Sequence, residues 1–408
     1  MRQPVPPLRA FLPGPCYRAL RQDRHGRVFP VPRLPGRILR RPPLPAAGSP
    51  AQGPRTSELR AHPLGRRRPG EELIMHRTPQ KWSRRRTLAV LGATLALPLG
   101  AAAAQRYGRR PDFVTWQGES LGGPAKLMLW HEDEAFARNT ITRMRSEIER
   151  LENVFSLFRT DSEIAQLNRN GQLTRPSQDM ATVLSAACDI AHTCNGAFDP
   201  TVQPLWRLYE THFRSTPASP YGPSASEIAT AQGLVDYSRI DIGARTIRFV
   251  QPGMAVTLNG IAQGYITDRI ADLLREEGFD HTIVDVGETR ALGTQPDGDP
   301  WSVAIVNPLS PSAIGRAIDL ENTALSVSGG YGQRFGRSTS HHIFDPATGL
   351  SANRLLDVAI VAPRAMLADG LSTALFVGGE DHAPALLKAY PGIKASGTRL
   401  DGTVFQTA

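Results

Sequence analysis

The sequence predicts an α+β fold, and two observations support this class. Amphipathic helical segments and short β-type segments both occur, and they come in blocks without the strict alternation of strand and helix found in a doubly wound parallel sheet. Between about residue 113 and residue 408 there is no low-complexity linker and no repeat of solenoid length. This predicts a single globular unit of about 290 residues.

Helices are predicted where apolar residues recur every three or four positions. In residues 136–158 this spacing is carried by Ile141, Met144, Ile148, Leu151, Val154 and Phe155. Residues 180–191 and 261–274 follow the same pattern. Strands are predicted where short β-type runs are bounded by Gly or Pro. These runs cover residues 247–250, 255–258, 282–286, 303–306 and 358–361.

Positive charge is concentrated near the N-terminal end of the 408-residue chain. Residues 1–104 contain 20 of the 47 Lys and Arg residues but only 4 of the 38 Asp and Glu residues. The other 304 residues therefore hold 27 basic and 34 acidic side chains, a formal net charge of −7, although the whole chain carries +9. Because no basic stripe with interleaved aromatics follows residue 104, we exclude nucleic acid as the partner.

Residues 1–74 form a basic extension that cannot bury a core. They hold 15 of the 34 prolines and 15 arginines but no lysine, and they show neither helical nor strand periodicity. One interpretation is a disordered arm. The interpretation that we favour is a mis-assigned start, with translation beginning at Met75.

Residues 75–104 have the layout of an export signal. A basic stretch, Ser83-Arg84-Arg85-Arg86, precedes an apolar run over residues 88–99 and four alanines over residues 101–104. The paired arginines indicate the twin-arginine route. The run is shorter than the roughly 20 residues of a membrane span. We therefore expect cleavage near Ala104 and a periplasmic mature protein, residues 105–408, without a stable membrane span.

Three cysteines, Cys16, Cys188 and Cys194, are too few for a disulfide framework and lack the spacing of a zinc site. Cys188 and Cys194 could pair in an oxidising compartment. A single helical segment could instead hold them too far apart for disulfide geometry. We favour two separate thiols.

Two glycine-containing segments are candidate ligand sites. Residues 258–265, Leu-Asn-Gly-Ile-Ala-Gln-Gly-Tyr, place glycines between a predicted strand and a predicted helix, where backbone N–H groups favour a phosphate. The alternative is a helix start with close packing. Residues 326–331, Ser-Val-Ser-Gly-Gly-Tyr, either let a ligand approach the backbone or form only a turn.

A histidine pair and a helix that carries Asp369 and Thr373 are candidate catalytic and metal-binding elements. His341 and His342 precede an Asp-Pro-x-x-Gly turn, which joins a titratable group to a rigid loop. A helix over residues 368–377 would place Asp369 and Thr373 one turn apart on the same face. Such oxygen ligands suit Mg²⁺ where substrate phosphates fill the remaining positions. Taken alone, a histidine is usually structural and Asp369 could equally be an N-terminal helix acid.

Taken in order, these segments resemble the ApbE family of FAD:protein FMN transferases, from about Trp116 to Val377. Two further motifs contribute. Residues 158–164, Phe-Arg-Thr-Asp-Ser-Glu-Ile, are similar to a Tyr-Arg-x-x-Ser-Glu-Leu stretch of the family, and residues 196–202, Gly-Ala-Phe-Asp-Pro-Thr-Val, closely match another family pattern. The resemblance implies an ApbE-like fold related to the T-fold, with mixed sheets and flanking helices.

The resemblance also implies an activity and a site. Such an enzyme splits FAD at its pyrophosphate, releases AMP and leaves FMN joined by a phosphoester to a Thr or Ser hydroxyl of an acceptor protein. Mg²⁺ would be held by the side chains of Asp369 and Thr373 and by the carbonyl of Gly260, with His342 as general base and His341 secondary. The positions implied for FAD are Leu121, Phe158, Ala197, Phe198, Asp199, Thr257, Gln263 and Ile343.

The chain departs from the family pattern at several positions. Thr257 and Gln263 stand where many members have Asp and Lys, so two opposite charges are lost together. Phe158 replaces the common Tyr but keeps an aromatic face. Val-Gly-Glu-Thr over residues 286–289 replaces a Gly-Gly-Asn or Gly-Gly-Asp turn. These changes resemble the exported subgroup that accompanies nitrous oxide reductase, which implies a membrane-bound redox flavoprotein as the acceptor.

Two other functions stay open beside flavin transfer. An FAD pyrophosphatase that gives free FMN and AMP would use the same metal, with water as the attacking group. A flavin-binding accessory protein would have lost catalysis through the altered loop at Thr257 and Gln263.

Overall fold

The computed structural model describes residues 97–98, 113–131, 133–215, 219–295, 297–336 and 339–407. The predictions for residues 1–74 lie outside the described residues, and so does the predicted export signal apart from Leu97–Pro98.

The described helices include two short 3₁₀ turns, η2 and η3. They are α3 (Glu134–Phe155), α4 (Glu163–Asn170), α5 (Gln178–Thr193), α6 (Gln203–Arg214), α7 (Ala225–Gln232), η2 (Tyr237–Arg239), α8 (Ala262–Glu276), α9 (Ala365–Gly378), η3 (Glu380–His382) and α10 (Ala383–Ala389). The described strands are β1 (Leu97–Pro98), β2 (Phe113–Ser120), β3 (Gly123–Trp130), β4 (Gln172–Thr174), β5 (Ile240–Ile242), β6 (Thr246–Phe249), β7 (Thr282–Asp285), β8 (Thr289–Leu292), β9 (Trp301–Asn307), β10 (Ser310–Leu320), β11 (Ala324–Gly329), β12 (Phe344–Asp345), β13 (Leu350–Ser351), β14 (Leu355–Ala362), β15 (Lys394–Arg399) and β16 (Val404–Gln406).

These strands form four sheets. The largest has eight strands in the order β16-β15-β14-β11-β8-β7-β3-β2, and its pairings are antiparallel. β1, β9 and β10 form a second antiparallel sheet, β4, β6 and β5 a third, and β12 and β13 a two-stranded hairpin. Helices and antiparallel sheets in separate blocks confirm the α+β class.

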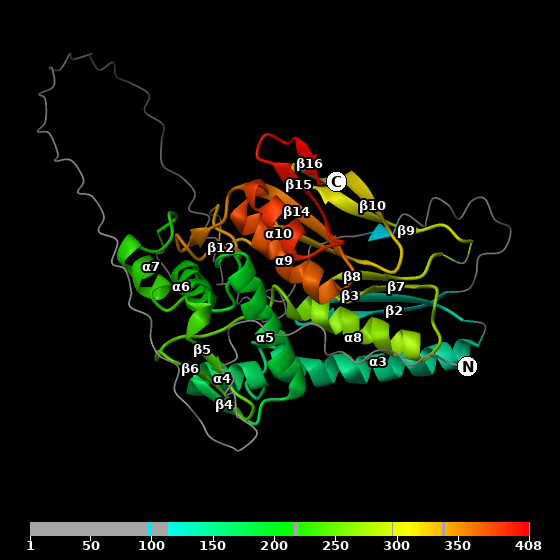
Figure 1. Cartoon of the computed structure of the whole chain (residues 1–408), viewed down its shortest axis with the longest axis horizontal. Coiled ribbons are helices and arrows are strands. Elements are labelled where there is room, and N and C mark those ends of the chain that lie inside the picture. Colours follow the sequence, from blue (N-terminus) through cyan, green and yellow to red (C-terminus); the bar gives the residue numbers. More distant parts are fainter. Residues whose placement is uncertain are drawn as a thin grey trace, which may run out of the picture. The chain divides into compact units, whose positions relative to one another are not determined.

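The eight-stranded sheet is covered on both faces. Along β14, Val358 and Ile360 belong to the main core, whereas Ala359 packs in a second cluster with Trp301 and Val303 of β9. Helices α8 and α9 cover the first face, where they contact β7, β8, β11 and β14 (Figure 1). Because neighbouring residues of a strand point to opposite faces, a strand covered on both sides is apolar throughout. This explains the continuous apolar run predicted over residues 358–361.

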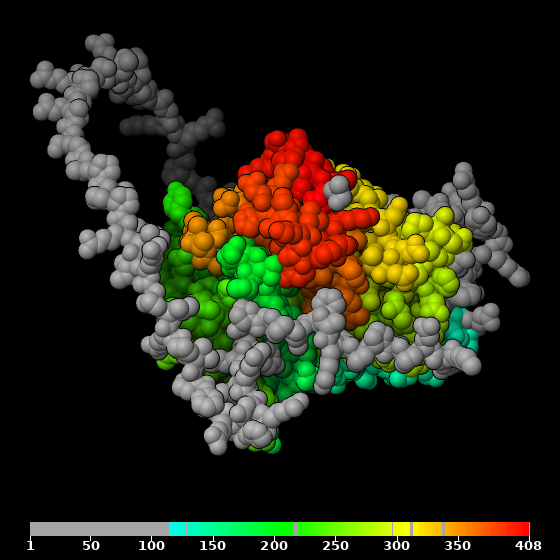
Figure 2. All heavy atoms as spheres, in the orientation of Figure 1, coloured from blue at the N-terminus to red at the C-terminus, as the bar shows by residue number. Residues whose placement is uncertain are grey.

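Sequence segments that are far apart meet on the helical face. Helix α5 contacts α9, and Figure 2 shows the green surface around α5 next to the orange and red surface of the C-terminal helices. Cys188 and Cys194 lie buried in and just after α5 and are not joined by a disulfide, as the favoured interpretation expected. Within the part of the chain that is described, none of the helices is long and apolar enough to cross a membrane.

Most predicted elements are confirmed. Helices α5 and α8 correspond to residues 180–191 and 261–274, and strands β6, β7, β9 and β14 correspond to four of the five predicted runs. The helix predicted over residues 136–158 is α3, but it ends earlier, at Phe155. The chain turns there because Ser156 is extended (φ −73°, ψ 121°) and its carbonyl accepts a hydrogen bond from Ser162 Oγ at 2.6 Å.

The strand predicted over residues 255–258 is wrong. Side chains and loops, and not a neighbouring strand, satisfy the backbone of this segment. Asn168 accepts a hydrogen bond from the Val256 N–H at 2.7 Å and donates one to the Val256 carbonyl at 2.8 Å. The Thr257 N–H donates to the Pro200 carbonyl at 2.8 Å. This buried segment leads directly to Gly260 and the start of α8.

Candidate functional site

One cavity brings together the twelve positions that the sequence resemblance implies for FAD, the metal and the general base. Its volume is about 440 Å³, within the range of small-molecule sites. The assigned residues that line it are Leu121, Phe158, Ala197, Phe198, Asp199, Thr257, Gly260, Gln263, His342, Ile343, Asp369 and Thr373. They come from distant parts of the chain, so the tertiary fold gathers them.

Two sides of this cavity are named here by the helices that build them. The α8–α9 wall consists of Gly260, Gln263, Glu288, Ser328, Asp369 and Thr373. The α6 wall consists of Trp206, Arg207, Glu210 and Arg214, together with Phe158.

The three predicted metal ligands lie close together in the α8–α9 wall. Helix α9 places Asp369 and Thr373 one turn apart, as predicted. A Cβ atom added to Gly260 would lie 3.1 Å from Thr373 Oγ1, so the backbone of Gly260 runs next to this hydroxyl. Asp369 Oδ2 accepts a hydrogen bond from the Gly264 N–H at 3.0 Å, which joins α9 to the first turn of α8.

The two buried carboxyl groups of this wall, Asp369 and Glu288, have raised pKa values. Burial raises the pKa of Asp369 to about 8. Burial, followed by the neighbouring charge of Asp369, raises the pKa of Glu288 well above its usual range. A raised pKa means that a carboxyl group tends to keep its proton in the absence of a cation. Because a cation can replace that proton, Asp369 and Glu288 make this wall a favourable place for a metal ion. Among the described residues no group of three or more His, Cys, Asp or Glu side chains is arranged to hold a metal. An ion here would therefore use Asp369 with neutral oxygens and substrate phosphates.

Glu288 was missed as a site residue. The sequence showed only that the turn over residues 286–289 departs from the family pattern, whereas the structure places this carboxylate in the cavity. Within this turn, the position before Glu288 needs a glycine. Gly287 has φ +97°, and a Cβ atom there would lie 2.9 Å from the Gln263 side chain. A charged residue in a tight turn directly after a buried strand was the available signal.

The structure separates the roles of the two histidines. His342 lines the cavity, and its Nδ1 lies 3.2 Å from the Gln333 carbonyl. A carbonyl only accepts, so Nδ1 carries the proton and Nε2 is left as the basic nitrogen. Burial lowers the pKa of His342 to about 4, which keeps the ring neutral. His341 is buried, with Nε2 2.7 Å from the Ala352 carbonyl, and supports the loop.

Polar contacts fix Leu121 and Asp199, which are two of the predicted FAD positions. Leu121 has φ +48° in the β2–β3 turn, and its N–H donates to Glu152 Oε1 at 3.1 Å. Asp199 is buried and accepts hydrogen bonds from the Thr201 N–H at 2.7 Å and the Tyr237 N–H at 3.1 Å. Burial raises the pKa of Asp199. These contacts hold the cavity lining in place.

The glycines at residues 258–265 and 326–331 serve close packing. A Cβ atom on Gly264 would lie 2.3 Å from the Ala365 carbonyl oxygen, so only glycine lets α8 approach α9 this closely. A Cβ atom on Gly330 would lie 2.6 Å from the His341 ring. Gly329 ends β11 and lines the cavity. Of the two interpretations of residues 258–265, phosphate binding or a closely packed helix start, the second describes Gly264.

Sequence reasoning also missed the α6 wall. Glu210 lies four positions from both Trp206 and Arg214 and three positions from Arg207, which places the four side chains on one side of α6. Arg214 forms an ion pair with Glu210 at 2.6 Å. The signal was the amphipathic spacing directly after the motif over residues 196–202.

Comparisons with known proteins point to one family. Residues 122–396 match the model of the ApbE family. The chain is 31% identical to the FAD:protein FMN transferase of Haemophilus influenzae over 71% of this chain and 86% of that one. It is 28% identical to the FAD:protein FMN transferase of Klebsiella pneumoniae over 74% and 88%.

Solved structures give the same result. The flavin transferase ApbE from Vibrio cholerae superposes with a TM-score of 0.64 at 27% identity, covering 73% of this chain and 97% of that one. The ApbE protein from Thermotoga maritima superposes with a TM-score of 0.65 at 25% identity, covering 72% and 97%.

Proposed function

We propose, from the premise that this chain belongs to the ApbE family, that it transfers FMN from FAD to a Thr or Ser hydroxyl of an acceptor protein, with Mg²⁺ and with release of AMP. Flavin transfer to an acceptor protein is the activity named for its relatives.

One observation carries the proposal. All twelve positions assigned from the sequence line a single cavity, with a neutral histidine and a pair of buried carboxylates in the same space. A pyrophosphate substrate needs neutralised oxygens, and an attacking hydroxyl needs a proton acceptor. The cavity contains residues suited to both needs.

His342 supplies the proton acceptor. Its Nε2 takes the proton of the acceptor hydroxyl as that oxygen forms a bond to the phosphorus on the FMN side of the pyrophosphate. The bond from that phosphorus to the bridging oxygen breaks, and AMP leaves with the bridging oxygen. The Gln333 carbonyl keeps the His342 ring in the required tautomer.

Asp369, Thr373 and the Gly260 carbonyl would hold Mg²⁺. One carboxylate with two neutral oxygens is a donor set that suits this ion when phosphate oxygens complete its shell. When bound, the ion would neutralise charge on the pyrophosphate oxygens. Ser328 supports this arrangement, since its Oγ lies 3.3 Å from Thr373 Oγ1.

Mass spectrometry of a flavin-acceptor protein tests the proposal. The acceptor is incubated with the enzyme, FAD and Mg²⁺, beside a reaction with chelator. An FMN adduct on Thr or Ser that requires metal supports the proposal. Free FMN and AMP with an unmodified acceptor would identify a pyrophosphatase. As a control, the same acceptor is incubated with a known enzyme of the family. If that enzyme modifies the acceptor but this protein leaves FAD intact, this protein is an accessory protein.

The proposed compartment is the periplasm, reached by the twin-arginine route, with a membrane-bound redox flavoprotein as the acceptor. The paired Arg84 and Arg85 ahead of the apolar run support this proposal. Replacing both with Lys should retain the protein in the cytoplasm, measured by cell fractionation. Export that is unaffected by this replacement would contradict the route.

A further inference from the structure

The proposed metal ligands are carried by two helices whose mutual position must be fixed. Gly260 precedes α8, while Asp369 and Thr373 lie on α9. The helices meet where Gly264 approaches the Ala365 carbonyl, one turn before Asp369. A shift of α9 along α8 would change the separation of the ligands.

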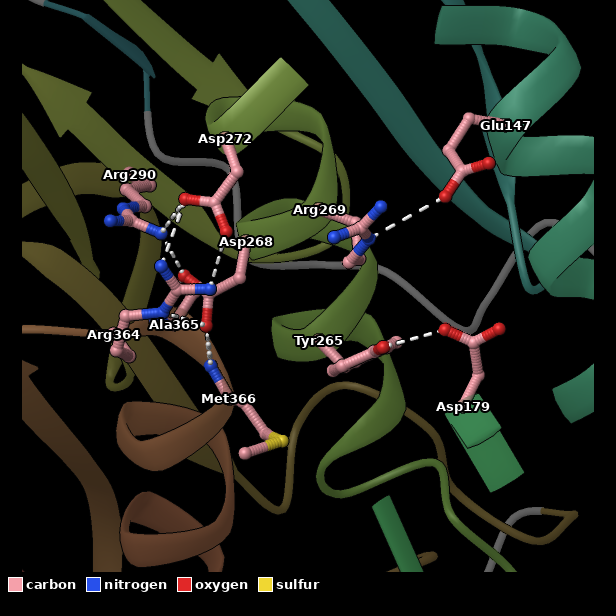
Figure 3. Close-up of polar contacts among 10 residues, drawn as sticks. All are labelled: Glu147, Asp179, Tyr265, Asp268, Arg269, Asp272, Arg290, Arg364, Ala365 and Met366. Atoms are coloured by element: carbon pink, nitrogen blue, oxygen red, sulfur yellow. Dashed lines mark hydrogen bonds and ion pairs between the residues drawn. The ribbon is translucent and has the colours of Figure 1, made fainter. Parts of the chain in front are cut away.

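Helix α9 has no N-terminal cap of its own. Arg364 occupies the N-cap position and makes no side-chain cap hydrogen bond. Asp268 of α8 takes over this role. Its Oδ1 accepts the Ala365 N–H at 2.9 Å and its Oδ2 accepts the Met366 N–H at 3.0 Å (Figure 3). A carboxylate is favourable at this end of a helix.

Arginines on both sides hold the Asp268 carboxylate in place. Asp268 is buried, and Oδ1 accepts a hydrogen bond from Arg290 of β8 at 2.5 Å. Arg364 Nε lies 3.2 Å from Oδ2, and Arg364 also binds Asp272 through two hydrogen bonds of 2.8 and 2.7 Å (Figure 3). Two arginines thus balance two aspartates, and the buried pair of Arg290 and Asp268 at the centre of this network resists displacement of either helix.

The other side of α8 is anchored as well. The Tyr265 hydroxyl donates to Asp179 of α5 at 2.6 Å, and Arg269 lies 3.5 Å from Glu147 of α3 (Figure 3). Helix α8 is therefore fixed to the rest of the domain, and the first turn of α9 is fixed to α8 through Asp268.

We propose that Asp268 is a positioning residue for the metal site: it holds the first turn of α9 against α8 so that Asp369 and Thr373 face the Gly260 carbonyl. This inference rests on the proposed metal-dependent function. Asp268 does not line the cavity, so its effect reaches the metal only through the position of α9.

The test compares Asp268→Asn with Asp272→Asn. Both variants lose one carboxylate charge next to Arg364, but Asp272 has no bond to the α9 backbone. Mn²⁺ binding to the FAD-loaded protein without acceptor is measured by electron paramagnetic resonance. FAD binding in chelator is measured by fluorescence, and folding by thermal denaturation.

We expect Asp268→Asn to raise the Mn²⁺ Kd by about 10-fold or more, because mutating residues that orient metal ligands weakens metal binding by about this factor. FAD affinity in chelator should stay within about twofold, and kcat should recover at high metal concentration. Asp272→Asn should leave the Mn²⁺ Kd nearly unchanged. If Asp268→Asn does not fold, Asp268→Glu keeps the charge but moves the carboxylate, and the same weakened Mn²⁺ binding is expected.

A folded Asp268 variant that binds Mn²⁺ as the unmodified protein does would overturn the inference, and so would equal weakening by Asp272→Asn. Either result leaves the proposed function intact. An unmodified protein that binds no Mn²⁺ and transfers flavin in chelator would overturn the proposed metal dependence together with the inference.

Discussion

The α8–α9 wall and the α6 wall of the cavity differ in what holds their side chains. In the first wall, Asp369 and Glu288 are buried in the main body of the domain, and backbone and side-chain hydrogen bonds from α8 and β11 fix α9. In the second wall, Arg207 and Arg214 are exposed, and Phe158 is 51% exposed.

The two walls also rest on different apolar clusters. The α8–α9 wall belongs to the main core, whereas α6 packs through Leu205 and Tyr209 on a separate cluster with Phe335 and Phe344. The ring centroids of Tyr209 and Phe344 are 4.9 Å apart. The first wall is therefore rigidly held, as the proposed metal site requires, whereas the second packs on a cluster separate from the main core.

The largest expected effect comes from the buried wall. Asp369→Ala removes the carboxylate proposed to hold Mg²⁺ and should lower the initial rate of flavin transfer by about 1,000-fold, because that ion would neutralise the pyrophosphate. The rate is measured from flavin fluorescence of the acceptor in gels. Asp381→Ala, an exposed acid beyond α9, is the control. A loss of less than tenfold would contradict the importance of this wall.

Replacing each histidine in turn distinguishes the proposed catalytic role of His342 from the structural role of His341. His342→Gln should lower kcat by about 100-fold, the lower end of the range for a general base, with little change in the KM for FAD. Steady-state kinetics measures both values. The control His341→Gln should lower the melting temperature, because it breaks the contact with the Ala352 carbonyl, while keeping more of kcat than His342→Gln. The opposite pattern would reverse the two assignments.

Phe158 tests the exposed side. Phe158→Ala should raise the KM for FAD by about 10-fold, since stacking of a base on an aromatic ring is worth about 1–3 kcal/mol. The melting temperature should hardly change because half of the side chain is already exposed. Phe158→Tyr, which retains the ring, is the matched control. An unchanged KM in the alanine variant would show that this ring does not contact FAD.

The smallest effect concerns pH. Burial lowers the pKa of His342 to about 4, and the neutral ring is the proposed active form, so the contribution of His342 to activity is lost as the pH falls towards that value. At saturating FAD and Mg²⁺, kcat should vary by less than about twofold between pH 5.5 and pH 8. An inflection near the ordinary histidine pKa would show that His342 is more solvated during turnover.

Local patterns predicted much of this architecture. The spacing of Ile141, Met144, Ile148 and Leu151 predicted α3, and the spacing of Asp369 and Thr373 predicted two side chains on one face of α9. Periodicity of this kind depends on neighbours within a turn or two, so a single sequence is enough to reveal it.

Contacts between distant residues were not predictable in this way. Residues 255–258 have the composition of a strand, but Asn168 satisfies Val256 from a position 88 residues earlier. The same limit applies to Glu288 and to the α6 wall, because their place in the cavity depends on how helices and sheets pack. The ordered motifs identified the cavity residues only through resemblance to a family whose fold already brings them together.

The cap of α9 has a consequence for the order of folding. Asp268 lies 97 positions before Ala365, so the first turn of α9 cannot satisfy its amide groups until α8 has docked. Nascent α9 would fray at this end, and the amides of Ala365 and Met366 would become protected from hydrogen exchange only when the long-range contact forms. Assembly of the proposed metal site is therefore coupled to the docking of α8 against α9.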